Sequence, residues 1–404
     1  MGSTVDLPKG NSPTLALVHP TEKEKLIQFN LNGAEWRGPL PLQSYLHREE
    51  VLASQPLTRD GGITYWILID ITAKKNPLDP TSSARLPLAS CETYRKKALV
   101  WQDGVVHETI THGIGSVFCA QHLRKRGYAQ RLMQELGKAL KTHQMTGGQE
   151  CLFSILFSDI GKKFYAEHGW EPFNSAHVSI PPAGPSKVSG DSLPNAKPLY
   201  AEDLEALCKI DEALVRKSLE SRAKNSNTAV ALIPDIETIR WHHAREDFVG
   251  TELHRKTPKV KGAIVGSEEG KRVWCYWTRM WYNEDPADSK GNTLHILRLV
   301  IEDEGSSSWE GSGVNVASTD HKHDAAIAAL LAMAQREAEE WKMEEVEAWN
   351  PSAATLAAAQ KLDPSAKVID RDMESIASLQ WYPAHEGRVA ESIDWVGNEK
   401  YGWC

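Results

Sequence analysis

Hydrophobic and polar positions over residues 1–180 predict an alternation of strands and helices. Apolar residues recur at helical spacing from Ala129 to Leu140, which predicts an amphipathic helix. Further helices are expected over 42–52 and 162–168 and after Thr21, which forms a capping box with Glu24. The β-branched, aliphatic and aromatic side chains that strands favour gather in residues 15–18, 63–69, 88–101, 105–119, 151–157 and 173–180. The predicted order is therefore β-αα-βββ-α-β-α-β.

The second half of the chain repeats this order of elements less regularly. Residues 183–198 are rich in Pro, Gly and Ser, so we expect a linker between a domain at 1–182 and a domain at 199–404. The second domain has strand patterns at 261–265, 272–282, 293–301, 345–349 and 376–381, and helix patterns at 204–221, 324–341 and 353–361. We therefore expect a second, diverged copy of one α/β fold with mixed sheets.

Composition excludes several classes of protein. The 404 residues suffice for two or three domains. A net charge of −8 argues against a nucleic-acid partner, and no apolar run is long enough to span a membrane. Together with a polar start that has no signal-peptide core, this predicts a soluble cytoplasmic protein. The six cysteines are scattered, which favours reduced thiols over disulfides, and we expect no metal site. His321 and His323 are expected in a solvated loop.

The segment from Arg124 to Ala129 carries the clearest chemistry. Its sequence, Arg-Lys-Arg-Gly-Tyr-Ala, joins a predicted strand to the start of the amphipathic helix. Free amides and the positive end of a helix dipole suit a pyrophosphate, and Gly127 removes a side chain that would hold the phosphates away. The pattern alone is common, so a solvated basic turn is the alternative.

The surrounding elements favour a pyrophosphate-binding turn over a solvated basic turn. The pattern resembles the acetyl-CoA-binding signature of the GNAT acetyltransferases, Arg/Gln-x-x-Gly-x-Gly/Ala, and it lies in the usual place of that signature, after the fourth strand. A second hallmark of that family, a Phe-Tyr pair before a Gly-aromatic turn, has its match in residues 156–170. Stretches that together resemble the fungal L-lysine N6-acetyltransferases are residues 14–19, 32–38, 59–63, 89–95, 113–120 and 158–170. The resemblance implies a GNAT acetyltransferase fold followed by a second, diverged GNAT-like α/β domain. That second domain is expected to lack the pyrophosphate loop, since its corresponding turn, 317–324, contains Asp320 and Asp324.

The resemblance also implies acetyl-CoA as co-substrate and a set of positions around it. The pantetheine arm would pair with the fourth strand, and one backbone amide there would stabilise the oxyanion. Tyr165 matches the position of the family's usual acid. A phenol suits this role, because it is protonated at neutral pH and can donate its proton to the leaving thiolate. The implied cofactor-binding residues are Val117, Phe118, Cys119, Arg124, Lys125, Arg126, Gly127, Tyr128, Ala129 and Ser158. Cys119 is not expected to act as a nucleophile, because no paired base flanks it.

The general base is left open by the sequence. Protein-lysine acetyltransferases of this superfamily carry a Glu where this chain has Gly115. His112 is the first candidate, and an ordered water is an alternative. Other candidates are Glu92, Glu108 and the terminal carboxylate of Cys404.

The predicted activity is acetyl transfer to the ε-amine of free L-lysine, which opens lysine catabolism. Alternatives are acetylation of another small amine (a polyamine, toxin or antibiotic) and a non-catalytic acetyl-CoA sensor. The C-terminal half is expected to close over the acceptor amine, and Trp274, Trp277 and Trp281 are expected mainly in its core. The sequence leaves the acceptor amine and the oligomeric state open.

Overall fold

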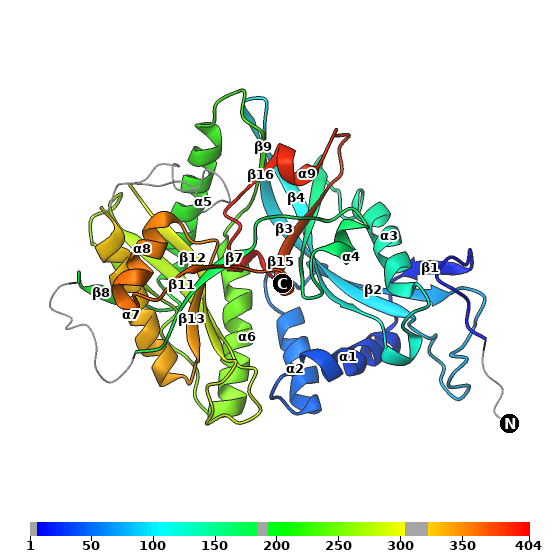
Figure 1. Ribbon diagram of the computed structural model, residues 1–404. Coiled ribbons are helices and arrows are strands. Elements are labelled where there is room, and N and C mark those ends of the chain that lie inside the picture. Colours follow the sequence, from blue (N-terminus) through cyan, green and yellow to red (C-terminus); the bar gives the residue numbers. More distant parts are fainter. Residues whose placement is uncertain (1–5, 184–192, 304–321) are drawn as a thin grey trace.

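The computed structural model describes residues 6–183, 193–303 and 322–404 and contains two mixed β-sheets, each flanked by helices (Figure 1). The central part of the predicted linker (184–192) and most of the acidic turn (317–321) lie outside the described residues. The predicted α/β class with mixed sheets is confirmed.

The first sheet has the strand order β1-β2-β3-β4-β5-β15-β6. Its strands from the first half are β1 (Leu15–Val18), β2 (Ile63–Asp70), β3 (Ala89–Gln102), β4 (Val105–Phe118), β5 (Cys151–Ser158) and β6 (Glu171–Pro172). Its helices are α1 (Glu22–Trp36), α2 (Leu42–Ala53), α3 (Tyr128–Leu140) and α4 (Lys163–Ala166). Both hydrogen bonds of the predicted capping box at Thr21 are present. The elements predicted for the first half are thus confirmed to within a few residues at their ends.

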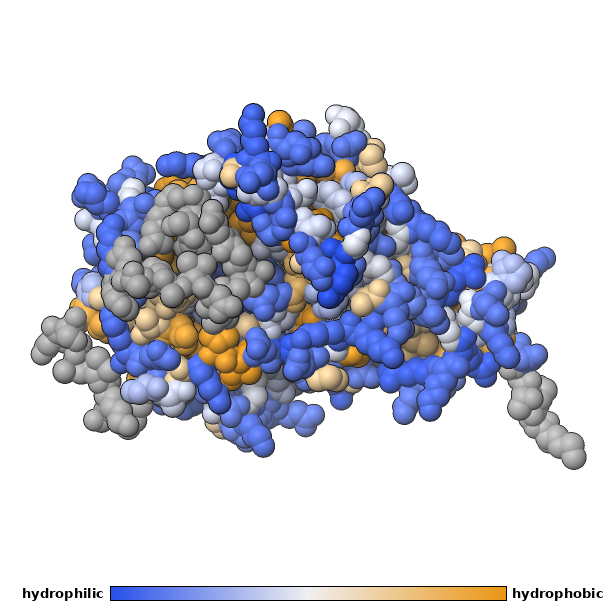
Figure 2. Space-filling model, turned by 45° about the horizontal axis from the view of Figure 1, so that its top comes forward, coloured by the Kyte–Doolittle hydropathy of each residue, from blue (hydrophilic) through white to orange (hydrophobic). Residues whose placement is uncertain are grey.

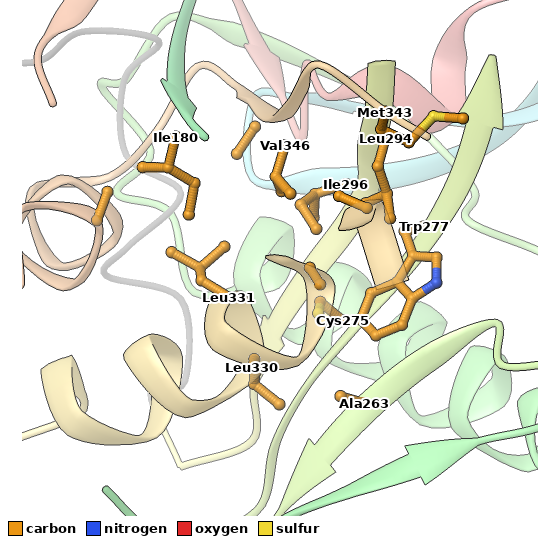
Figure 3. Packing of buried hydrophobic residues seen from close by; sticks show 14 of the residues in the cluster. Ile180, Ala263, Cys275, Trp277, Leu294, Ile296, Leu330, Leu331, Met343 and Val346 are labelled. Atoms are coloured by element: carbon orange, nitrogen blue, oxygen red, sulfur yellow. The ribbon is translucent and has the colours of Figure 1, made fainter. Parts of the chain in front are cut away.

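The second sheet has the order β14-β7-β13-β12-β11-β10-β8. Its strands are β14 (Val368–Asp370), β7 (Ala176–Ile180), β13 (Glu345–Trp349), β12 (Thr293–Ile301), β11 (Val273–Met280), β10 (Gly262–Val265) and β8 (Ala196–Leu199). One face packs on α7 (Asp324–Glu340) and α8 (Ala353–Leu362), and Leu330 and Leu331 of α7 share one apolar cluster with Trp277 and Ile296 (Figure 3). Trp274, Trp277 and Trp281 are all buried, so their predicted place in the core is confirmed.

Strands are exchanged between the two halves of the chain. From the second half, β15 (Ile376–Trp381) pairs with β5, while β9 (Thr228–Leu232) pairs with β3 and with β16 (Ile393–Val396). From the first half, β7 pairs with β13 and β14 of the second sheet. One apolar cluster includes Phe153 of β5, Trp274 of β11 and Leu207 of α5 (Leu204–Glu220). The halves are therefore interlocked, and the division into 1–182 and 199–404 stays a prediction.

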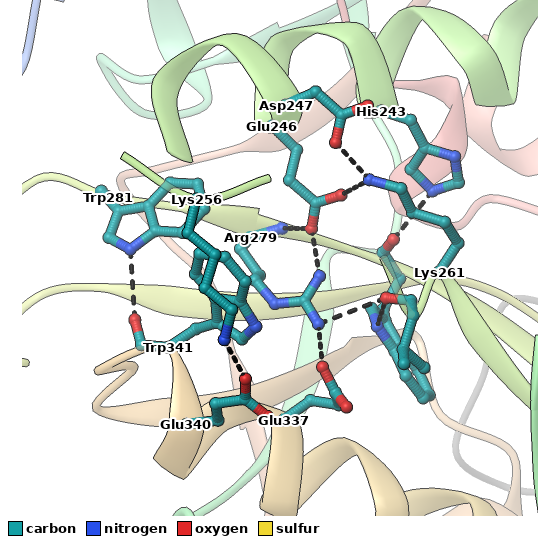
Figure 4. Close-up of polar contacts among 12 residues, drawn as sticks. His243, Glu246, Asp247, Lys256, Lys261, Arg279, Trp281, Glu337, Glu340 and Trp341 are labelled. Atoms are coloured by element: carbon teal, nitrogen blue, oxygen red, sulfur yellow. Dashed lines mark hydrogen bonds and ion pairs between the residues drawn. The ribbon is translucent and has the colours of Figure 1, made fainter. Parts of the chain in front are cut away.

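Helix α6 (Ile236–His254) lies between the halves and was not predicted from the sequence. Its buried residues mix polar with apolar side chains, so the sequence shows no clear apolar stripe; they include Thr238, His242, His243 and Glu246 beside Ile239, Trp241 and Val249. Glu246 pairs with Arg279 of β11 and, at 2.6 Å, with Lys261, and Arg279 also pairs with Glu337 of α7 (Figure 4). This buried ionic network anchors α6 to the second sheet.

The opposite side of α6 contacts the first half. The Ser44 hydroxyl of α2 donates to Glu252 at 2.8 Å, and the rings of His47 and Phe248 lie 5.5 Å apart.

Hydrophilic residues cover most of the face shown in Figure 2. In the described residues, every helix is too short or too polar to cross a bilayer.

Candidate active site

The end of β4 has an open backbone edge. Strands β4 and β5 run parallel and are paired from Ile110 to Ile114, opposite Cys151 to Leu156. Beyond Ile114 the register between β4 and β5 ends, while β5 continues to Ser158 with β15 on its other edge. Residues 115–118, which include the predicted positions Val117 and Phe118, therefore have no strand partner on the β5 side in the described chain. Their amides and carbonyls on that side can bind an extended ligand.

The predicted phosphate-binding turn is exposed and begins α3. Gly127 precedes the helix with φ 82°, a left-handed conformation that favours glycine. No side chain caps the helix start, so its first amides can bind an anion. Lys125 and Arg126 are exposed beside it. The arrangement fits a diphosphate held by main-chain amides with flanking positive charge.

Two neighbouring segments hold this turn in place. The Gly10 amide donates to the Arg126 carbonyl at 2.7 Å, and the Tyr128 hydroxyl donates to the Pro8 carbonyl at 2.5 Å. Arg124 donates to the Cys119 carbonyl at 2.9 Å and pairs with Glu35 at 3.3 Å. In this structure the contacts of Arg124 therefore stabilise the conformation of the turn.

Tyr165 and Ser158 lie near the end of β5. The buried Tyr165 ring shares an apolar cluster with Cys91 of β3 and Phe118 of β4, and burial raises its pKa above the usual value. Ser158 donates to the Gly161 carbonyl at 2.7 Å, so its hydroxyl shapes the turn between β5 and α4. Burial also raises the pKa of Cys119, which disfavours a thiolate there.

His112 and Glu108 lie away from Gly115. Alternate residues of a strand point to opposite faces, and His112 shares its face with Ile114, which packs in the cluster of α3. Its Nε2 is 3.1 Å from Gln144 and its Nδ1 is 3.4 Å from the Cys151 thiol. Burial, and next His143, lowers its pKa to about 4. Glu108 is exposed and pairs with Arg216 at 2.8 Å.

Glu92 lies directly across from Gly115 in the β3–β4 ladder and is 1% exposed. Its Oε2 accepts hydrogen bonds from the Tyr94 hydroxyl at 3.0 Å and from Ser116 at 3.2 Å. Its Oε1 is buried and has no partner among the described residues. Burial, and next the nearby charge of Glu49, raises the pKa of Glu92 to about 8. A carboxylate with such a pKa and one free oxygen can accept a proton near neutral pH.

Cys404 covers the two glycines of β4. A Cβ added at Gly115 would lie 3.3 Å from the Cys404 backbone oxygen, and one at Gly113 would lie 2.6 Å from its Sγ. Figure 1 shows this end of the chain between the two sheets. The glycines at these positions leave room for Cys404, which lies on the same face of the sheet as Glu92.

Further buried polar atoms of α1 and β3 have no partner among the described residues. Gln28 of α1 reaches the Cys91 carbonyl at 3.4 Å, but its Oε1 is unpaired, as are both amide atoms of Asn32 one turn later. Lys96 Nζ, beside Gly113, is also unpaired. Because buried polar groups are ordinarily hydrogen-bonded, such a concentration points to a polar ligand.

The position of Glu92 had a signal in the sequence. Asp103 and Gly104 form a two-residue hairpin turn, so Gln102 pairs with Val105, and counting ten residues back and forward from that pair joins Glu92 to Gly115. Helix α6, by contrast, brings Trp241 against the Tyr94 ring at 5.5 Å with no such signal.

Comparison with known proteins identifies relatives over most of the chain. Residues 177–404 match the family model described as the LYC1 GNAT-like C-terminal domain. A lysine acetyltransferase of Yarrowia lipolytica is 26% identical over 284 residues, which cover 61% of this chain and 68% of the relative. An uncharacterized protein of Saccharomyces cerevisiae is 21% identical over 409 residues, covering 92% and 93%.

A solved structure shares the fold of nearly the whole chain. It is a protein of unknown function from Enterococcus faecalis, described as a probable N-acyltransferase, with a TM-score of 0.50 and 15% identity. The match covers 91% of this chain and 73% of that one. At this identity the likeness concerns the fold alone.

Proposed function

Since this chain belongs to the LYC1 GNAT-like family and is a GNAT N-acetyltransferase, we propose that it transfers the acetyl group of acetyl-CoA to the ε-amine of free L-lysine. The observation that carries this proposal is the buried Glu92 carboxyl group facing Gly115 at the open end of β4. The Yarrowia lipolytica relative, a lysine acetyltransferase, supports lysine as the acceptor. A cytoplasmic role at the start of lysine breakdown is part of the same proposal.

The residues of the turn and of β4 fit acetyl-CoA, which GNAT acetyltransferases generally use. In the proposed complex, the amides of Gly127, Tyr128 and Ala129 hold the diphosphate, and Lys125 and Arg126 add positive charge. The backbone of Val117, Phe118 and Cys119 pairs with the pantetheine arm. Arg124 and Ser158 act indirectly, by holding the two turns in shape.

The proposed base is Glu92 rather than His112. Glu92 has a free carboxylate oxygen on the face of Gly115, whereas both ring nitrogens of His112 have partners on the other face. The substrate ammonium, with a pKa of about 10.4, loses its proton to Glu92 directly or through one water. The amine nitrogen then attacks the thioester carbonyl carbon.

The proposed acid is Tyr165. As the carbon–sulfur bond breaks, the electron pair goes to sulfur, and the phenol donates its proton to the departing thiolate. The attacking nitrogen releases its second proton to water, and the resulting phenolate takes a proton back from water. Burial raises the pKa of Tyr165, which keeps the phenol protonated over the working pH range. An amide at the open end of β4 stabilises the oxyanion in between.

The second half restricts the acceptor to a small molecule in this proposal. Helix α6 packs on α2, and Trp241 and Cys404 cover the Glu92 side of the sheet, which leaves little access for a folded protein. The interlocked strands mean that removing the second half would also remove β15 and β9 from the first sheet. The whole chain is therefore the right object for the test.

The test is release of CoA thiol from acetyl-CoA by the full chain with free amino acids, polyamines and lysine peptides. We expect free L-lysine to be the best substrate, with N6-acetyllysine as product. A preference for peptides or polyamines would refute the substrate assignment. Binding of acetyl-CoA without turnover of any amine would indicate a sensor instead of an enzyme.

A further inference from the structure

Arg245 on α6 is a cation without a counter-ion beside the candidate site. Its side chain is half-buried, and its guanidinium lies 5.8 Å from the centre of the Trp403 ring. Among the described residues it makes no hydrogen bond or ion pair. Burial, and next the charge of Arg48, lowers its pKa to about 10. The Glu49 carboxylate forms an ion pair with Arg48 at 2.6 Å and not with Arg245.

A second basic side chain contacts the same indole. Lys400 is 2% exposed, and its Nζ lies 4.3 Å from the Trp403 ring centre and 4.4 Å from that of Trp349. It too has no ion pair in the described chain. Burial lowers its pKa to about 7, with Arg245 among the groups that lower it.

The acidic groups nearest to Lys400 are Glu347 and Asp159, which raise its pKa against the effect of burial. Glu347 faces His295 at 3.4 Å and accepts the indole N–H of Trp349, and Asp159 accepts the Ser375 amide at 2.9 Å. Buried charges in proteins are normally paired, because leaving water without a counter-ion is costly. Arg245, which forms no ion pair with a described residue, therefore marks, with Lys400 on the same indole, a site for an anion supplied from outside.

The anion site and the proposed base flank the last residues of the chain. Trp403, whose ring both basic side chains contact, precedes Cys404, whose backbone oxygen lies over Gly115 opposite Glu92. Trp403 also lies 6.4 Å from Trp241, which packs on Tyr94, the donor to Glu92. A small acceptor with an amine at one end and an anion at the other matches this arrangement.

We propose that Arg245, assisted by Lys400, binds the α-carboxylate of a free amino acid and so selects an amino acid over a simple amine. This inference rests on the proposed function and names the group that recognises the substrate. Arg245 is the stronger partner, because a guanidinium can donate two parallel hydrogen bonds to a carboxylate. The ε-amine at the other end of lysine then reaches Glu92.

The experiment compares L-lysine with 1,5-diaminopentane, which has the same amine and no carboxylate, on the full chain and on Arg245→Gln. We expect the variant to raise KM for L-lysine by about 10- to 100-fold, the loss typical of a hydrogen bond to a charged group, with little change in kcat. KM for 1,5-diaminopentane should not change. Arg245→Lys keeps the positive charge but cannot donate two parallel hydrogen bonds, so it should restore part of the affinity for L-lysine.

The matched control is Arg240→Gln on the same helix. Arg240 is exposed and pairs with Glu205 on the surface at 3.4 Å, so its loss should leave both KM values unchanged. An unchanged KM for L-lysine in Arg245→Gln, or an equal rise for both substrates, would overturn the inference. Should the wild-type chain acetylate neither compound, the proposed function fails, and calorimetric binding of L-lysine to wild type and Arg245→Gln still decides this inference.

Discussion

Glu92→Gln is the substitution that tests the proposed chemistry most directly. The amide keeps the shape of the side chain and can still accept from Tyr94 and Ser116, but it cannot take a proton at neutral pH. Removing a positioned base costs about 10²- to 10⁴-fold in rate, so we expect kcat/KM at pH 7 to fall within that range. The Tm should change little, since packing around the side chain is preserved.

The pH profile gives the sharper result. Glu92 acts as a base only when ionised, and its pKa of about 8 means that roughly one-tenth of the molecules are ionised at pH 7. Wild-type kcat/KM for lysine should therefore rise about tenfold per pH unit below pH 8 and level off above it. The Glu92→Gln variant has no base and can use only lysine whose amine is already deprotonated. Its kcat/KM should therefore rise without a break toward the lysine pKa of about 10.4.

The same assay separates the candidate bases. His112, with a pKa of about 4, would produce a break near pH 4 and none near pH 8. Other charged groups around Glu92, chiefly Glu49 and Arg48, remain in the variant. Glu108→Gln is the control, because its exposed pair with Arg216 is remote from Gly115. A wild-type profile without a break near pH 8, or an unchanged rate in Glu92→Gln, would refute the assignment.

Three further substitutions test the cofactor turn, the acid and the buried network. Gly127→Glu puts a negative charge against the proposed diphosphate and should raise KM for acetyl-CoA by about tenfold or more. Gly148→Glu, a control at the same φ of 82°, should leave this KM unchanged. An equal rise in KM for the two variants would indicate an effect of backbone strain alone. Tyr165→Phe should lower kcat about 10²-fold with both KM values kept, and a wild-type kcat would exclude it as the acid. Arg279→Met leaves the buried Glu246 charge with one partner fewer and should lower the free energy of unfolding by about 3–5 kcal/mol in urea titrations; a loss below about 1 kcal/mol would contradict the network's role.

Local patterns determined most elements of this protein. The periodic apolar residues of α3, the continuous apolar run of β5 and the capping box of α1 each depend on neighbours within a turn or a strand, which the sequence displays directly. The same holds for the turn at Gly127, whose φ of 82° agrees with the residue type. Even the pairing of Glu92 with Gly115 follows from one hairpin turn.

Long-range packing decided the rest. The exchange of β7 and β15 between the sheets joins residues far apart in the chain, and no local pattern specifies which edge a strand will pair with. Helix α6 buries an ionic network together with a few apolar side chains, so hydrophobic periodicity does not reveal it, and the sequence does not place Arg245. The sequence therefore determined the elements and the cofactor turn, whereas only the tertiary structure brought Arg245, Trp403 and Cys404 to the face of Glu92, because those contacts arise when the two halves close on each other.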